Sequence, residues 1–257
     1  MSNQESSSQG ISRRKFLGAS AATAGLSVAS GVSLISVAEA KPLDTAISSD
    51  QRWGMLIDTN KCATGCTSCV DACNTENGLN TGDEQLSRQS QKAQWIRKVE
   101  LRDKTTGHEV SLPLMCQHCE NPPCVDVCPT GASFKREDGV VLVDKHICIG
   151  CRYCMMACPY KARSFIHEEL LNQVEDVPRG KGTVESCTLC VHRIDEDTNN
   201  RRDPACAEAC NTAGHKAMVF GDMKDTNSEI SKQLKKHSSK AIRADLKLNP
   251  GVRYRGI

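Results

Sequence analysis

The sequence is poor in aromatic residues and lacks the motifs of common enzyme classes. Aromatic side chains make up 4% of its 257 residues, so a hydrophobic core has few large side chains to bury. It contains no G-x-G-x-x-G loop, P-loop, Ser-His-Asp signature or Cys-His nucleophile pair. The formal net charge of +2 gives no support to nucleic-acid binding. We therefore expect no substrate chemistry by this chain alone, and a core that needs additional stabilisation.

Cysteine, in contrast, is abundant, with 16 residues. Eight lie in two adjacent groups of four. The second group has the C-x2-C-x2-C-x3-C-P spacing of bacterial ferredoxins: Cys148, Cys151, Cys154 and Cys158, followed by Pro159. The first group has this frame with a longer middle gap: Cys116, Cys119, Cys124 and Cys128, followed by Pro129. Three closely spaced thiolates can bind three corners of an iron–sulfur cubane, while the fourth binds the neighbouring cluster. Such clusters also stabilise a fold as structural metals do.

Two further groups of cysteines flank this central pair. The first group has one extra residue in its first gap, where Gly65 can adopt a positive φ: Cys62, Cys66, Cys69 and Cys73. The last group encloses a polar insert, residues 191–205, which we predict to be a surface loop: Cys187, Cys190, Cys206 and Cys210. Alone, this last group also fits a zinc ribbon. The other three groups favour an iron–sulfur cluster here too.

Each group follows one plan of strand, cysteine loop, short helix and strand. We predict an α+β fold of two bacterial-ferredoxin-like modules, with short strands, short helices and long loops around four cubane clusters. The inner module spans residues 94–170 with a hairpin insertion. The outer module combines residues 50–93 and 180–225, and residues 226–257 form a C-terminal tail. Two β-hairpins are expected, one around Lys104–Gly107 and one around Asp138-Gly139.

Exchange of the fourth cysteine between neighbouring clusters predicts the ligands of four [4Fe–4S] clusters. In the outer module, cluster 1 has Cys62, Cys66, Cys69 and Cys210, and cluster 2 has Cys73, Cys187, Cys190 and Cys206. In the inner module, cluster 3 has Cys116, Cys119, Cys124 and Cys158, and cluster 4 has Cys128, Cys148, Cys151 and Cys154. His118 and His215 lie within or beside these groups, but the cysteines already fill all four sets. Clusters arranged in this way form a chain that can carry electrons.

Several basic residues flank the central cysteines: Lys145, His146, Arg152, Lys161 and Arg163. Positive charge near a cluster favours its reduced, more negative form and raises its reduction potential. Ordinary surface charge is the alternative interpretation.

Residues 1–40 are predicted to be an export signal. Arg13 and Arg14 precede a weakly apolar Ala/Ser/Gly run, which ends at an A-x-A cleavage pattern, Ala38–Ala40. This arrangement resembles a Tat signal, which suits a protein that must fold around its clusters before export. We therefore expect a periplasmic location. Retention of the apolar run as a membrane anchor is the alternative.

The cysteine groups across residues 52–230 resemble the four-cluster iron–sulfur subunits of the DmsB/NrfC/PsrB type. Within that family, the segments WGMLIDTNKC, GCTSCVDAC and NTENGLN are most similar to the exported DsrO-type subunits of DsrMKJOP complexes. Asn74 and Asn211 depart from the ferredoxin pattern, in which a proline follows the last cysteine.

The resemblance implies an electron-transfer subunit of a membrane-associated redox complex, not an enzyme. It implies a relay between a quinone-interacting membrane subunit of the NrfD/DsrP type and partners in sulfite or sulfide metabolism. Those partners would be a triheme cytochrome of the DsrJ type and subunits of the DsrMK type. The alternative is the iron–sulfur subunit of a molybdopterin oxidoreductase that reduces dimethyl sulfoxide, polysulfide or tetrathionate. Reduction of a small molecule at a cluster itself would require a missing ligand, and no cysteine is missing.

Overall fold

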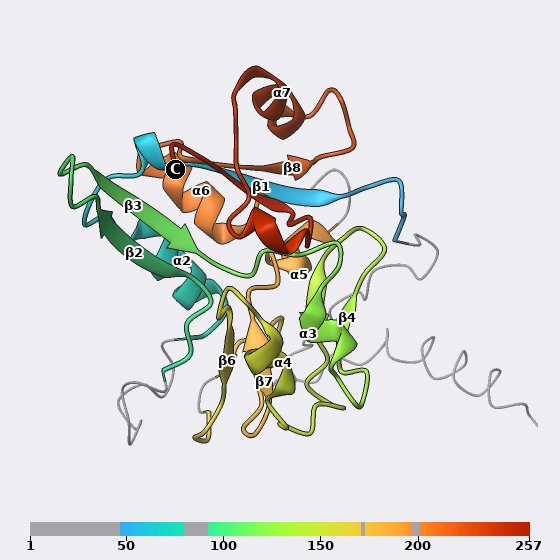
Figure 1. Ribbon diagram of the computed structural model, residues 1–257. Coiled ribbons are helices and arrows are strands. Elements are labelled where there is room, and N and C mark those ends of the chain that lie inside the picture. Colours follow the sequence, from blue (N-terminus) through green and yellow to red (C-terminus); the bar gives the residue numbers. More distant parts are fainter. Residues whose placement is uncertain (1–46, 80–91, 171–172, 197–200) are drawn as a thin grey trace, which may run out of the picture. The chain divides into compact units, whose positions relative to one another are not determined.

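Short strands and short helices alternate with loops along the chain (Figure 1). The structure is a computed structural model and describes residues 47–79, 92–170, 173–196 and 201–257. The export signal predicted for residues 1–40 lies outside these ranges. The elements and the many buried cysteines confirm the predicted α+β ferredoxin-like fold class.

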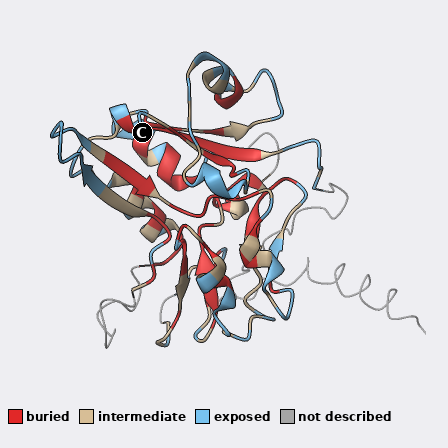
Figure 2. Cartoon of the chain, in the orientation of Figure 1, coloured by how far each residue is buried: buried red, intermediate tan, exposed pale blue. Residues whose placement is uncertain are grey.

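A three-stranded sheet joins the two ends of the described chain. Its central strand is β1 (Trp53–Asp58), which pairs antiparallel with β8 (Met218–Asp222) and parallel with β9 (Val252–Arg255). All six residues of β1 are buried, as Figure 2 shows. A central strand covered on both faces requires the near-continuous apolar run that the sequence has here.

Helices α6 (Ala205–Thr212) and α7 (Glu229–Lys236) pack against this sheet. Helix α2 (Ser68–Glu76) packs against α6, although the two lie far apart in the sequence. Helix α7 packs on β8 and is capped by Ser228, whose side chain accepts a hydrogen bond from the backbone N–H of Ser231. Two short 3-10 turns complete this part: η1 (Thr59–Lys61) and η4 (Ala244–Leu246).

The remaining strands form three two-stranded sheets. The first two sheets confirm the predicted hairpins: β2 (Arg97–Arg102) with β3 (Glu109–Leu114), and β4 (Ser133–Lys135) with β5 (Val141–Val143). The third sheet pairs β6 (Arg163–Phe165) with β7 (Val184–Ser186). Two short helices, α3 (Pro123–Asp126) and α4 (Tyr153–Ala157), pack against each other between these sheets. Strand β7 belongs to the predicted outer module, and it pairs with β6 of the predicted inner module.

The prediction of a surface loop for residues 191–205 is wrong at both ends. Ala205 is buried and already belongs to α6. Residues Val191–Ile194 form helix α5, and both Arg193 and Ile194 are buried. Ile194 joins the main hydrophobic core. Arg193 finds carboxylate partners on α2 and α6, and such pairing makes burial of a charge in a polar segment possible.

The C-terminal segment is built into the fold. Tyr254 of β9 is fully buried, and its hydroxyl donates a hydrogen bond of 3.0 Å to the Pro113 carbonyl. The same hydroxyl accepts a hydrogen bond of 3.0 Å from Nε2 of Gln117. The segment that the sequence suggests to be a tail thus ties the first sheet to strand β3 and to the residue that follows Cys116.

We predict that Tyr254→Phe destabilises the protein, because the buried Pro113 carbonyl loses its donor. The cost should be about 1–3 kcal/mol. At about 2–4 °C per kcal/mol for a chain of this size, the thermal midpoint should fall by several degrees. The midpoint can be followed without oxygen as loss of the visible iron–sulfur absorption. Tyr153→Phe is the matched control, because Tyr153 is 54% exposed, and an equal effect of the two changes would contradict the prediction.

Candidate iron–sulfur centres

All sixteen cysteines lie in the described residues and none forms a disulfide. They gather in four groups that mix cysteines from different parts of the sequence. One group lines a cavity beside β8: Cys62, Cys66, Cys69 and Cys210. The loop before α2 turns at Gly65, whose φ of 75° confirms the predicted positive value. Burial raises the pKa of Cys69 to about 12, and the nearby Cys62 and Cys210 add to this effect.

A second group is buried between α2, α5 and α6: Cys73, Cys187, Cys190 and Cys206. Burial raises the pKa of Cys73 well above its ordinary value, and the other three thiolates raise it further. The last cysteine quartet of the sequence is therefore divided. Three of its members surround Cys73, and Cys210 lines the first cavity.

The central cysteines form the other two groups. The third group is wholly buried: Cys116, Cys119, Cys124 and Cys158. Burial raises the pKa of Cys119 to about 12, and Cys124 and Cys158 contribute. The fourth group lines a second cavity, between β5, α4 and β7: Cys128, Cys148, Cys151 and Cys154. Burial is also the largest cause of the raised pKa of Cys154, with contributions from Cys148 and Cys128.

These donor groups fit cubane clusters. Four thiolates in apolar surroundings repel one another, and bound iron ions offset this cost by holding them deprotonated. Among the described residues, no three His, Cys, Asp or Glu side chains lie close enough to hold a single metal ion. Ligands of one zinc ion would lie roughly 4 Å apart, whereas a cubane binds each thiolate on a separate iron. Sixteen cysteines in four groups of four, most of them buried, fit four [4Fe–4S] clusters.

The two histidines near the cysteine groups occupy different surroundings. His118 is 1% exposed, and its Nδ1 accepts a hydrogen bond of 3.0 Å from the backbone N–H of Val141. Burial lowers the pKa of His118 to about 3, so this side chain is neutral at physiological pH. His215 lines the first cavity beside Cys62 and Cys210.

The five basic residues that flank the central cysteines have different surroundings in the structure. Lys161 and His146 are exposed. Nζ of Lys145 donates to the Pro178 carbonyl, and the Arg152 guanidinium stacks on the Phe165 ring. Arg163 is different, because it is buried and donates a hydrogen bond of 3.1 Å to Sγ of Cys124.

Sequence reasoning missed Lys98, which lies close to the first group. Its Nζ donates to the carbonyls of Ala63 and Cys66, so its charge reaches the cysteine loop. Lys98 comes from the β2 strand of a hairpin more than thirty residues later in the chain. No local motif links that hairpin to the loop, so the pairing becomes visible only in three dimensions.

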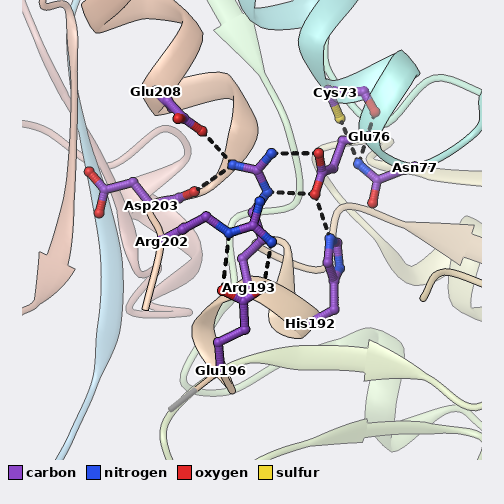
Figure 3. A network of polar contacts seen from close by, with 9 residues as sticks. All are labelled: Cys73, Glu76, Asn77, His192, Arg193, Glu196, Arg202, Asp203 and Glu208. Atoms are coloured by element: carbon purple, nitrogen blue, oxygen red, sulfur yellow. Dashed lines mark hydrogen bonds and ion pairs between the residues drawn. The ribbon is translucent and has the colours of Figure 1, made fainter. Parts of the chain in front are cut away.

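An ionic network holds the elements around the second group together (Figure 3). Arg193 of α5 donates through Nε and Nη2 to Glu76 of α2, and through Nη1 to Glu208 of α6. His192 also contacts Glu76, at 2.7 Å. Hydrogen bonds from Arg193 are the largest cause of the lowered pKa of Glu76, which is about 2. Next to Glu76, Nδ2 of Asn77 approaches Sγ of Cys73 at 3.6 Å.

Comparison with known proteins gives consistent matches. A family model described as a 4Fe-4S dicluster domain matches residues 108–223. The chain is 41% identical to the Hdr-like menaquinol oxidoreductase iron-sulfur subunit 1 of Archaeoglobus fulgidus, across 95% of this chain and 97% of that protein. It is 38% identical to a tetrathionate reductase subunit of Salmonella typhimurium, across 88% and 83% of the two chains. It is also 38% identical to the protein NrfC of Escherichia coli, across 72% and 71%.

We predict that Glu76→Gln weakens the attachment of α5 to α2, because Arg193 loses its charged partner on α2. Loss of a hydrogen bond to a charged group costs about 1.5–3 kcal/mol. The thermal midpoint, measured without oxygen, should therefore fall. Glu169→Gln is the control, because the Glu169 side chain is 81% exposed and lies 4.0 Å from Lys181; it should change the midpoint little. A Glu76→Gln protein as stable as this control would show that the network is dispensable.

Proposed function

This chain belongs to the family of 4Fe-4S electron-transfer subunits that includes NrfC and the tetrathionate reductase relative, and we propose that its four clusters form one electron-transfer wire with two accessible ends. The chain is an electron-transfer subunit of an oxidoreductase complex and not the catalytic subunit. The bound clusters supply reversible one-electron chemistry. The polypeptide holds them in order, excludes water from the middle of the wire and exposes its ends.

The ligand sets that we propose are those expected from the exchange of the fourth cysteine. The first and second groups would form an outer module from residues 50–93 and 180–225. The third and fourth groups would form an inner module within residues 94–170. What supports these sets is that each proposed quartet contains thiolates that raise one another's pKa.

The order of the wire rests on thiolates of different groups that lie near enough to raise one another's pKa. Burial is the largest cause of the raised pKa of Cys206, and Cys69 of the first group adds to it. Cys187 of the second group likewise adds to the burial effect on the pKa of Cys116. Cys154 of the fourth group adds to the burial effect on the pKa of Cys124. These three junctions support the order of clusters 1, 2, 3 and 4.

Exposure supports the assignment of the ends. All ligands proposed for clusters 2 and 3 are buried. At the cluster 1 end, Cys62 and Cys66 are partly exposed. At the cluster 4 end, Cys151 is exposed and Cys128 and Cys148 are partly exposed. Electrons would therefore enter at one of these ends and leave at the other.

The proposed partners follow from the resemblance of the cysteine motifs. One would be an integral membrane subunit of the NrfD/DsrP type that exchanges electrons with quinone. The others would be cytochrome and DsrMK-type subunits of sulfur metabolism. The relative from Archaeoglobus is named as a menaquinol oxidoreductase subunit, which supports a quinol-linked role. The match to the tetrathionate reductase relative favours a second candidate function, as the iron–sulfur subunit of a molybdopterin reductase.

None of the helices in the described residues has the length and apolar character needed to span a bilayer. The twin-arginine segment at Arg13 and Arg14 supports a proposed periplasmic location. There, the protein would meet the membrane through its partner subunits.

The first test is the iron and acid-labile sulfide content of protein purified without oxygen, with zinc assayed in the same sample. Four cubanes require about sixteen iron and sixteen sulfide per chain. About twelve iron with one zinc would contradict the four-cluster wire. Reduction of the purified protein by a menaquinol analogue, in the presence of the membrane subunit, would then test the quinol-linked role.

A second test addresses the exchange of the fourth cysteine. We predict that Cys210→Ser alters the same cluster signal in electron paramagnetic resonance (EPR) as Cys66→Ser, because both residues would bind cluster 1. Cys206→Ser, four residues from Cys210, should alter a different signal because Cys206 would bind cluster 2. If Cys210→Ser and Cys206→Ser changed one and the same signal, the proposed ligand sets would be wrong.

A further inference from the structure

Arg163 on β6 is a buried cation that forms no ion pair with a carboxylate in the described part of the chain. It is 6% exposed. The other buried arginines have acidic partners: Arg179 pairs with Glu185 at 2.8 Å, and Arg193 pairs with Glu76 at 2.5 Å. A buried charge is costly unless it is paired and hydrogen bonded. Arg163 therefore requires negative charge from another source.

The surroundings of Arg163 identify that source as sulfur. Its Nη2 donates to Sγ of Cys124 at 3.1 Å and to Oγ of Ser133 at 2.8 Å. Its Nε and Nη1 are buried and have no acceptor among the described protein atoms. The unused N–H groups of this side chain are therefore available to acceptors that the polypeptide itself does not supply.

The charge of Arg163 acts on two proposed ligand sets at once. On the cluster 3 side, its Nη2 donates to Sγ of Cys124. On the cluster 4 side, its strand β6 packs against α4, the helix that carries Cys154, and the charge of Arg163 partly offsets the effect of burial on the pKa of Cys154. Because these cysteines come from α3 and α4, which pack against each other, one guanidinium on the adjacent strand can reach both groups.

We propose that Arg163 is a positioning residue shared by the two inner clusters, which holds thiolates of both and raises both reduction potentials. This inference rests on the ligand sets proposed above. Reduction adds negative charge to a cluster, and an uncompensated buried cation stabilises that charge. The planar guanidinium can donate in several directions at once, which a lysine ammonium on a flexible stem does less well. Electron transfer from the outer to the inner module becomes more favourable as a result.

The two clusters of the outer module do not share this feature. Arg193 lies near Cys190, but Glu76 and Glu208 compensate its charge. Lys98 lies near the first group, with Glu100 at 3.7 Å. A large electrostatic effect of a single cation is thus expected at the inner clusters.

The test is an EPR-monitored redox titration of the full chain, purified without oxygen, in three variants. In Arg163→Gln, the equilibrium constant for reduction of both inner clusters should fall at least tenfold, which is about 59 mV for a one-electron couple. Arg163→Lys keeps the charge but loses the planar set of N–H donors, so both potentials should fall by less than in Arg163→Gln. Lys161→Gln removes the same charge from an exposed site two residues away and should change neither potential.

The signals of the inner clusters are identified beforehand by their loss in Cys119→Ser and Cys151→Ser. Unchanged potentials in Arg163→Gln with full iron content, or a shift of one inner cluster alone, would overturn the proposal. If Arg163→Gln loses iron, Arg163→Lys decides: lowered potentials of both clusters support the proposal, and unchanged ones overturn it. Failure of the proposed wire can be distinguished from failure of this proposal, because the wild-type protein would then contain fewer than four clusters.

Discussion

The structure depends on the electrostatic cost of gathering thiolates in a dry interior. Within each of the four groups, burial and neighbouring sulfur raise cysteine pKa values, so the polypeptide alone disfavours the charged arrangement that it builds. Bound iron offsets this cost, so the free energy of cluster binding contributes to the free energy of folding. This explains how a chain with 4% aromatic residues sustains a core, since most cysteines are buried and half of them pack in the main core cluster that holds five of the aromatic side chains.

The path of the chain is the means by which distant cysteines meet. Strand β1 leads into the first cysteine loop, and β8 returns after the last one to pair with β1. Helices α2 and α6 are thereby packed together, which brings Cys73 to the cysteines of the last quartet and Cys210 to those of the first. Strand β9 closes the same sheet on its other edge. Buried cations then differ by site: Arg193 is neutralised by carboxylates, whereas Arg163 faces sulfur.

Several features of the fold could be predicted because their causes are local. Alternating strands around Lys104–Gly107 and Asp138-Gly139 indicate hairpins, and both form. The insert after Cys190 could not be predicted in the same way, because its polar composition suggests solvent exposure throughout. Ile194 packs in the core and Arg193 pairs with two carboxylates, and neither partner is near in sequence. The pairing of β7 with β6 could not be predicted for the same reason.

The sequence by itself determined the chemistry, because the spacing of cysteines on one loop dictates which metal group that loop can wrap. It thus indicated four [4Fe–4S] clusters and an electron-transfer role without a substrate site. Only the tertiary structure decided which cysteines are buried and which reach the surface, such as Cys151. It also decided that Arg163 alone, among five basic residues near the central cysteines, lies against sulfur. Burial and electrostatic contact depend on segments far apart in the chain, so spacing along the sequence cannot specify them.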